Sequence, residues 1–301
     1  MVEPLLAGLE LGGTKCFALL GRGQTIVERV AIPTTDPGET MDRLEAQLRV
    51  WWDRASFAAL GIGSFGPVGL DHARDDYGFI TTTPKPGWSG TDVAGRFGHA
   101  FAVPVGFDTD VTAAAMAEHR WGAARGMTSS VYLTIGTGIG GGAIVNGRPL
   151  RGFLHPEMGH VRVRREENDD FAGTCPFHAD CLEGLASGPA IAARAGRPAQ
   201  DIPAGDPLWQ PVAGAIAELL ATLILTLSPQ RIAIGGGVGC GQPHLFPLIR
   251  ARVATMLAGY VAGVDAGTLD MLIAPACFGD HAGPLGTFAL ALAAIEDSAD
   301  G

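Results

Sequence analysis

The feature that most restricts the fold of this sequence is a plan of three short strands around a glycine turn, which occurs twice. In the first copy, residues 5–20 predict two apolar strands joined by a turn at Gly12-Gly13-Thr14-Lys15, and residues 25–31 predict the third strand. The turn is not a Walker A loop, because no GK[ST] follows a glycine at the required spacing. Taken alone, this copy is best interpreted as an ordinary hairpin.

The second copy lies more than a hundred residues later in the chain. Residues 131–135 predict a strand, residues 136–142 a glycine loop and residues 143–145 another strand, before Asn146-Gly147 forms a hairpin turn. A third short strand follows, as in the first copy. The repetition indicates an internal duplication, in which each copy contributes one glycine loop suited to phosphate.

The second glycine loop also matches a different kind of site. Gly136, Gly138 and Gly141 satisfy the dinucleotide pattern G-x-G-x-x-G, and they follow a predicted strand. That pattern requires a helix next, with the pyrophosphate of the cofactor at its N-terminus. The segment that follows predicts a strand and a hairpin turn instead, so the dinucleotide interpretation fails.

Between the two copies, an aspartate stands where a strand gives way to a helix. Residues 103–107 predict the strand, residues 111–121 predict the helix, and Asp110 lies at the junction. A carboxylate at a strand end and a glycine loop that can hold phosphate are the two parts that a phosphoryl-transfer site needs most. Asp110 is therefore the candidate for the general base.

A second cluster of reactive side chains follows the second copy. Cys175, His178 and Cys181 stand at two-residue separations, which allows a tight turn to direct them to one point. With His160 upstream they form a Cys₂His₂ set, the ligand types and number of a closed, structural zinc site. The other cysteines occur singly in apolar surroundings and are interpreted as small core residues.

The last third of the chain alternates strands and helices, which implies an α/β fold. Residues 208–227 predict a long apolar helix, residues 231–234 a strand that ends in Gly235-Gly236-Gly237, residues 269–276 a strand and residues 283–294 a closing helix. The glycine run after the strand offers a backbone surface on which a flat base could lie.

Composition excludes several classes of protein. The net charge of −10 and the sequence pI of about 5.2 argue against a nucleic-acid partner and against an anionic membrane surface. An odd number of cysteines argues against a disulfide framework. Residues 1–20 lack the basic region of a signal peptide, and residues 213–227 are too short and polar to span a bilayer. We therefore expect a cytoplasmic protein.

Taken together, these stretches resemble the ROK family of sugar kinases, within the actin-like ATPase fold of hexokinases. Residues 8–15 match the first phosphate loop of the family, residues 134–142 the second, and residues 234–238 the adenosine loop. Glu157-Met158-Gly159-His160 matches the motif E-x-G-H, in which the Glu and the His contact the sugar and the His also binds zinc. Asp110 matches the catalytic aspartate.

Within the family, residues 61–71 and 77–88 resemble the bacterial fructokinase branch. Three departures from the general pattern agree with that branch. Glu10 replaces an aspartate of the first loop, Thr109 replaces the asparagine before the catalytic aspartate, and His178 takes the place of a cysteine. These departures argue against a glucokinase.

The resemblance implies two actin-like (ribonuclease H-like) α/β domains with a cleft between them. The expected N-terminal domain spans residues 1–112, with the closing helix near residues 283–296 packed back on it. The expected C-terminal domain spans residues 113–301 and carries the zinc-binding segment 160–181. The implied reaction transfers the γ-phosphate of ATP, with Mg²⁺, to the 6-hydroxyl of D-fructose. The family also suggests a homodimer that binds a hexose and a nucleotide.

The expected site residues fall into three groups. The nucleotide would contact Gly12, Gly13, Thr14, Lys15, Thr137, Gly138, Gly140, Gly235, Gly236 and Gly237. The sugar would contact Thr109, Asp110, Glu157 and His160. A structural zinc ion would be bound by His160, Cys175, His178 and Cys181.

Other members of the family remain as alternatives. A mannokinase, a glucokinase or an N-acyl hexosamine kinase would share the same catalytic parts. A non-catalytic sugar sensor of the repressor type would carry a helix-turn-helix segment before the first glycine loop. That loop begins at Gly8, so we expect no such segment.

Overall fold

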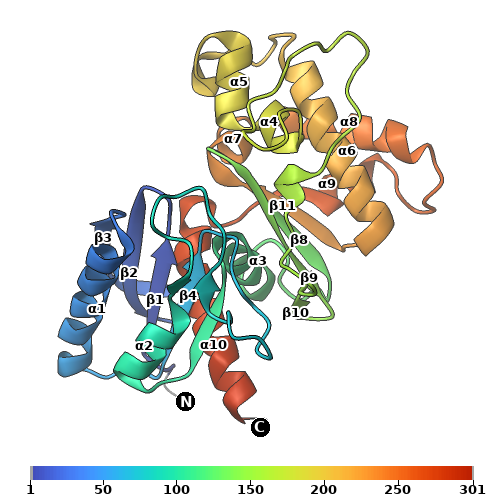
Figure 1. Cartoon of the computed structure of the whole chain (residues 1–301). Coiled ribbons are helices and arrows are strands. Elements are labelled where there is room, and N and C mark those ends of the chain that lie inside the picture. The colour runs from blue at the N-terminus through green and yellow to red at the C-terminus, as the bar shows by residue number, and fades with distance from the viewer. Residues whose placement is uncertain (1–2, 300–301) are drawn as a thin grey trace. The chain divides into compact units, whose positions relative to one another are not determined.

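The computed structural model describes residues 3–299, which form two compact units (Figure 1). The first unit consists of the chain up to Trp121, the short segment Pro149–His155 and the chain from His281 onward. The second unit consists of Gly122–Arg148 and Pro156–Asp280. The boundary that we expected after residue 112 falls within a helix whose residues belong to the first unit.

The first unit is built on a five-stranded sheet with the order β3-β2-β1-β4-β7. Strands β1 and β2 are antiparallel, whereas β1, β4 and β7 are parallel to one another. The strands of this sheet are β1 (Leu6–Leu11), β2 (Lys15–Arg22), β3 (Thr25–Pro33), β4 (Ala59–Ser64) and β7 (Val105–Thr109). Between β4 and β7 lie a small hairpin of β5 (Phe79–Ile80) and β6 (Thr91–Asp92) and helix α2 (Ala94–Phe101).

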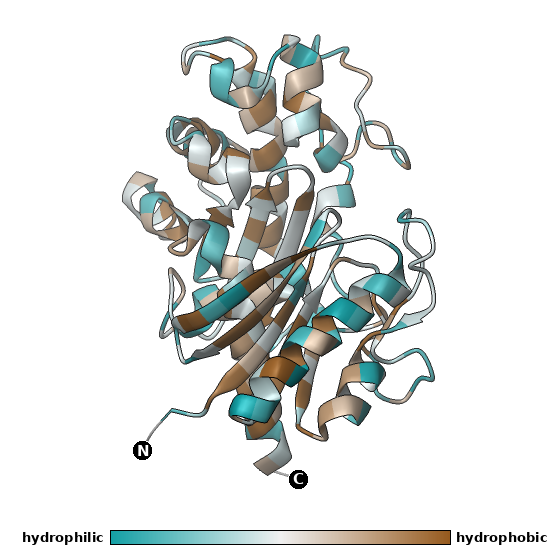
Figure 2. Ribbon diagram, turned by 90° about the vertical axis from the view of Figure 1, so that its left-hand side faces the viewer, coloured by the Kyte–Doolittle hydropathy of each residue, from teal (hydrophilic) through white to brown (hydrophobic). Residues whose placement is uncertain are grey.

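The start and the buried face of helix α1 (Pro37–Arg54) both follow from its local sequence. The side chain of Asp36 caps the helix by accepting a hydrogen bond from Glu39 N at 3.0 Å, and Pro37 occupies the first turn. Four apolar residues at helical spacing are buried, namely Met41, Leu44, Leu48 and Trp51. Figure 2 shows the resulting alternation of teal and brown along the surface helices.

Two further helices, α3 (Asp110–Arg120) and α10 (Ala282–Ala299), pack against each other and against this sheet. Glycines in the sheet allow α10 to approach closely. A Cβ atom at Gly61 would lie 1.7 Å from Thr287 O, and one at Gly106 would lie 2.2 Å from Leu290 O. The C-terminal helix thus belongs to the core of the first unit.

The second unit repeats this sheet, in the order β10-β9-β8-β11-β12. Strands β8 and β9 are antiparallel and β8, β11 and β12 are parallel, as in the first unit. The shared order supports the duplication inferred from the sequence. The strands are β8 (Ser130–Ile135), β9 (Ile139–Val145), β10 (Arg148–Pro149), β11 (Arg231–Gly235) and β12 (Ile273–Pro275).

The helices of the second unit lie between and after these strands. They are η1 (Met158–His160), α4 (Leu182–Ala186), α5 (Gly188–Ala195), η2 (Ala199–Asp201), α6 (Trp209–Leu227), α7 (Gly236–Gly241), α8 (Leu245–Leu257), α9 (Ala266–Leu272) and, at the end of the unit, η3 (Gly279–His281). The strand expected at residues 269–276 is wrong in its first half, because residues 269–272 are helical. A short apolar run does not distinguish the two structures.

Helix α6 matches the long apolar helix predicted for residues 208–227, but the prediction that this region is too short and polar to span a bilayer is wrong by length and composition. Its 19 residues and its hydropathy of 1.6 are sufficient to cross a membrane by length and composition alone. However, 61% of that apolar window is buried, and the helix packs against α4 and α8. A core helix accounts for these properties.

Candidate active site

Asp110 is the first residue of α3, directly after β7, as the sequence indicated. The helix is capped by its neighbour, because Thr109 Oγ1 accepts a hydrogen bond from Thr112 N at 3.1 Å. The side chain of Asp110 is half-buried, and its Oδ1 accepts a hydrogen bond from Val111 N at 2.8 Å. Because Thr109 already caps the helix, a capping role does not account for the aspartate at position 110.

Thr109 itself was expected to contact the sugar. It is buried, with 3% of its surface exposed, and its hydroxyl also donates to Thr112 Oγ1 at 2.8 Å. A threonine at a helix start is equally suited to capping, and the local hydrogen bonds here are those of a cap. Its contact with a sugar stays a prediction.

Glu10 is a second carboxylate beside Asp110, and it is not among the site residues predicted from the sequence. It lies in β1, beside Gly63 of β4, and Gly283 at the start of α10 leaves room for its side chain. Burial and, next in size, the negative charge of Asp110 raise the pKa of Glu10 from its ordinary value of 4.5 to about 7, against the opposing charges of Arg29 and Lys15. An acid with a raised pKa beside a candidate base is typical of a functional site.

The pKa of Glu10 gives a test of this arrangement. The unfolded chain releases this proton near pH 4.5, whereas the folded chain keeps it until about pH 7, so the stabilisation is lost as the pH rises through 7. We expect Glu10→Gln to increase the free energy of unfolding at pH 8 by up to about 3 kcal/mol, and to change it little near pH 4.5. Urea unfolding without added Mg²⁺ at both pH values measures this. A difference that is the same at both values would contradict the assignment.

A buried ion pair supports the strand that leads to Asp110. Asp108 is fully buried, and its Oδ2 accepts from Arg151 Nε at 2.9 Å and from Nη2 at 2.6 Å. Its Oδ1 accepts from Thr109 N at 2.7 Å. Arg151 belongs to the segment Pro149–His155, which follows the second copy but packs in the first unit. The sequence offered no signal for this pair.

The turn Gly12-Gly13-Thr14-Lys15 connects β1 and β2 in the first unit. Gly12 is required there, because a Cβ atom would lie 2.7 Å from Lys15 O. At Gly13, by contrast, no heavy atom lies within 4 Å of the position that a Cβ atom would occupy, among the residues described. Thr14 and Lys15 are exposed. The turn therefore presents bare backbone to a ligand.

The second glycine loop is shorter than we expected. It covers Gly136–Gly138, because Gly140 lies within β9, where it pairs with Thr134 of β8. A run of glycines has no side-chain pattern from which the start of a strand could be recognised. Thr137, at the centre of the loop, is exposed.

Glu183 holds this loop and was also missed by the sequence analysis. Its Oε2 accepts a hydrogen bond from Ile139 N at 3.0 Å, and a Cβ atom at Gly138 would lie 2.7 Å from the same oxygen. Glu183 is the second residue of α4, just after Cys181. The loop is thereby joined to the helix that begins at the cysteine cluster.

Gly235, Gly236 and Gly237 lie where β11 passes into α7. Gly236 has a φ of +80°, and a Cβ atom there would lie 2.5 Å from Ile135 O, so only glycine fits. A Cβ atom at Gly136 would lie 3.6 Å from Gly237 N. The two glycine segments of the second unit are therefore neighbours.

Glu157 precedes the short helix η1 and His160 is its last residue, and His160 N donates to Glu157 O at 3.0 Å. Gly159 is the glycine of the E-x-G-H motif, and packing requires a glycine at this position. A Cβ atom at this position would lie 1.8 Å from Ile139 O, so only glycine lets η1 pack on β9. The side chain of Glu157 is exposed and that of His160 is half-buried.

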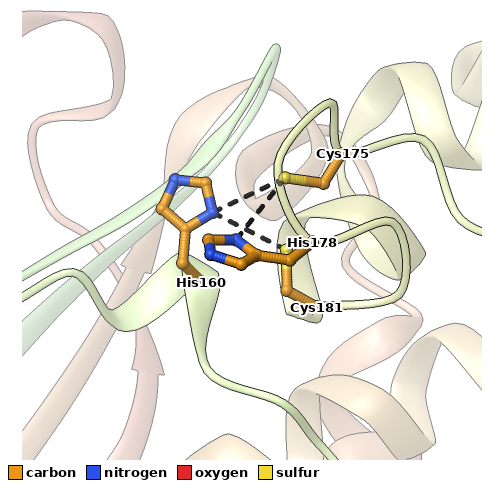
Figure 3. Close-up of side chains that lie close together, drawn as sticks. All are labelled: His160, Cys175, His178 and Cys181. Atoms are coloured by element: carbon orange, nitrogen blue, oxygen red, sulfur yellow. Dashed lines mark hydrogen bonds between the residues drawn. The ribbon is translucent and has the colours of Figure 1, made fainter. Parts of the chain in front are cut away.

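The four expected metal ligands converge in the second unit (Figure 3). Their ligand atoms all lie within 4.8 Å of one another. His160 Nδ1 lies 3.7 Å from Cys175 Sγ and 3.6 Å from Cys181 Sγ, and Cys175 Sγ lies 3.8 Å from His178 Nδ1. Tetrahedral zinc with its usual bond lengths requires ligand separations of about 3.3–3.8 Å. The donor set and its size therefore fit zinc.

The predicted site residues thus divide between the two units. The first unit carries Gly12–Lys15, Thr109 and Asp110, together with Glu10. The second unit carries the other two glycine segments, Glu157 and the four residues of the metal cluster. Each group is assembled within its own unit.

Comparison with known proteins extends over nearly the whole chain. The model of a family described as ROK matches residues 6–294. The putative fructokinase of Bacillus subtilis strain 168 is 43% identical over 297 residues, covering 98% of each protein. The fructokinase of Pediococcus pentosaceus is 41% identical over 296 residues, covering 98% of this chain and all of its own. The crystal structure of a ROK hexokinase from Thermus thermophilus, 29% identical, has a TM-score of 0.78 and covers 97% of this chain and 99% of its own.

Proposed function

This chain belongs to the ROK family, with the two-domain actin-like ATPase fold of its hexokinases, and we propose that it is an ATP-dependent fructokinase. The observation that carries the proposal is its similarity, over nearly its full length, to proteins named fructokinase. Glu10, Thr109 and His178 are also the residues expected of that branch.

We propose that Asp110 is the general base. Its carboxylate takes the proton of the 6-hydroxyl of fructose as O6 bonds to the γ-phosphorus of ATP and the bond to the bridging oxygen breaks, releasing ADP. This role is supported by the position of Asp110 at the start of α3, where Thr109 already serves as the cap.

The nucleotide would bind on bare backbone. Its phosphates would contact Gly12–Lys15 and the loop around Thr137 and Gly138, and its adenosine would contact Gly235–Gly237. Gly140 lies within β9, and it remains a candidate contact for the phosphates. Carboxylate oxygens such as those of Glu10 and Asp110 are the ligands that Mg²⁺ prefers, and the ion would neutralise charge on the phosphate oxygens.

The sugar would be held by Glu157 and His160, with Thr109 as a further expected contact. The zinc ion proposed for the four-residue cluster is structural, because four protein ligands leave no open position. It would fix the orientation of His160 through Nδ1. We further propose a cytoplasmic homodimer that binds a hexose and a nucleotide, and neither nucleic acid nor membrane.

Product analysis tests the proposed function. The protein is incubated with fructose, ATP and Mg²⁺, and the products are separated and quantified. We expect fructose 6-phosphate and ADP in equal amounts. Phosphorylation at another hydroxyl would contradict the regiochemistry. Formation of ADP and inorganic phosphate alone would contradict the kinase assignment.

A further inference from the structure

The chain contains 21 lysine and arginine residues, and only two of them, Lys15 and Lys85, are lysines. Both lie at the same turn of the first unit. Lys15 is the last residue of Gly12–Lys15, and Lys85 Nζ donates a hydrogen bond to Gly13 O at 2.6 Å. Lys85 is 72 residues distant in sequence, so the fold brings it to the turn. No function described above uses it.

The loop that carries Lys85 is firmly anchored. It joins β5 to β6, and Lys85 N donates to Thr83 Oγ1 at 3.3 Å. Trp88 is fully buried, its Nε1 donates to Thr35 O at 2.9 Å, and its ring packs against Phe65 at a centroid distance of 5.2 Å. The side chain of Lys85 extends from this anchored loop to the Gly12–Lys15 turn.

Lys85 completes a set of contacts to the carbonyl groups of this turn. Gly12 O accepts from Thr34 Oγ1 at 2.8 Å, and Thr14 O accepts from Thr34 N at 3.0 Å. With Gly13 O bound by Lys85, three consecutive carbonyl groups are fixed. A trans peptide directs its N–H opposite to its C=O, so these contacts fix the directions of the next three N–H groups as well. Fixed backbone N–H groups are what an anion-binding turn requires.

We propose that Lys85 is a nucleotide-positioning residue, which holds the Gly12–Lys15 turn through Gly13 and brings its positive charge to the phosphate bound there. This inference rests on the proposed function, because it takes the turn to be a phosphate site. An ammonium group has three donors, and one binds Gly13, so two can be shared with phosphate oxygens. The open space at Gly13 gives a phosphate group room to approach.

The small number of lysines allows a direct test of binding that needs no sugar. Lysine labelled with ¹³C at Cε, supplied during expression, labels only Lys15 and Lys85, and Lys85→Arg identifies the Lys85 signal by removing it. This label leaves the charge and the three donors of each ammonium group unchanged. We expect the Lys85 signal in an NMR spectrum to shift when Mg²⁺ and a non-hydrolysable ATP analogue are added. A Lys85 signal that stays unchanged while that of Lys15 shifts would overturn the proposal.

Kinetics separate positioning from a merely structural role. Lys85→Met keeps an unbranched side chain that ends one atom short of the lysine nitrogen, and it removes the charge and the donors. We expect kcat/KM for ATP to fall about 10- to 100-fold, the usual range for a charged hydrogen bond, with KM for fructose within about twofold. Lys85→Arg should recover most of the loss. Arg43→Met, at an exposed position on α1, controls for the loss of one positive charge and should behave as the wild type.

Two kinetic results would overturn the proposal. One is an unchanged kcat/KM for ATP in Lys85→Met. The other is an equal weakening of ATP and fructose with a lowered Tm, which indicates a structural residue. A wild-type protein that binds the ATP analogue but phosphorylates no hexose would contradict the proposed function, and the NMR shift would still decide the role of Lys85.

Discussion

Replacing Asp110 with asparagine is expected to lower kcat for fructose by about 10²–10⁴-fold, the usual contribution of a general base. Asparagine has the same shape but cannot accept the proton of the attacking hydroxyl. Stability should change little, because Thr109 rather than Asp110 caps α3. Steady-state rates at saturating fructose and ATP, together with urea unfolding, measure both quantities.

Asp36→Asn is a matched control for this change. Asp36 caps α1 through Glu39 N, and asparagine caps a helix about as well as aspartate. The control should therefore retain the wild-type kcat and stability. A folded Asp110→Asn protein with a near-normal kcat would exclude Asp110 as the base. A loss of about 1 kcal/mol in stability with unchanged kcat would assign it a helix-capping role instead.

The second large effect concerns the metal cluster. Protein purified without added metal is expected to contain one zinc ion per chain, and Cys181→Ser is expected to contain much less. Structural zinc contributes about 10–16 kcal/mol of binding free energy in zinc-finger peptides, so we expect the variant to lose several kcal/mol of stability. Fructose binding should weaken as well, since His160 belongs both to the cluster and to the proposed sugar site.

Elemental analysis and thermal unfolding measure these effects. Cys240→Ser provides the control, because Cys240 belongs to the same unit but not to the cluster. The interpretation of Cys240 as a core residue is wrong, since its side chain is exposed. It should keep its zinc and its Tm. Substoichiometric zinc in the wild type, or a Cys181→Ser protein as stable as the wild type, would contradict the assignment.

Local patterns in the sequence predicted much of this fold. The two glycine plans, the strand-to-helix junction at Asp110 and the ligand spacing of Cys175 and Cys181 each depend on residues close together in the chain. The sheet orders then follow the same plan in both units. Because both sheets have the same strand order, the duplication inferred from the sequence is also a duplication of the fold.

The features that the sequence did not predict depend on contacts between residues far apart in the chain. Arg151 pairs with Asp108 across 43 residues, and Lys85 reaches Gly13 across 72. Nothing near either residue indicates its partner. The unusual pKa of Glu10 likewise depends on burial and on Asp110, which only the folded chain supplies.

The ratio of kcat/KM for fructose to that for glucose, measured under identical ATP and Mg²⁺ concentrations, tests the central claim most directly. Both sugars use the same catalytic parts, so the ratio isolates the discrimination between substrates. We expect a ratio above one, with mannose as a secondary substrate. A ratio that favours glucose or an N-acetyl hexosamine would contradict the assignment as a fructokinase.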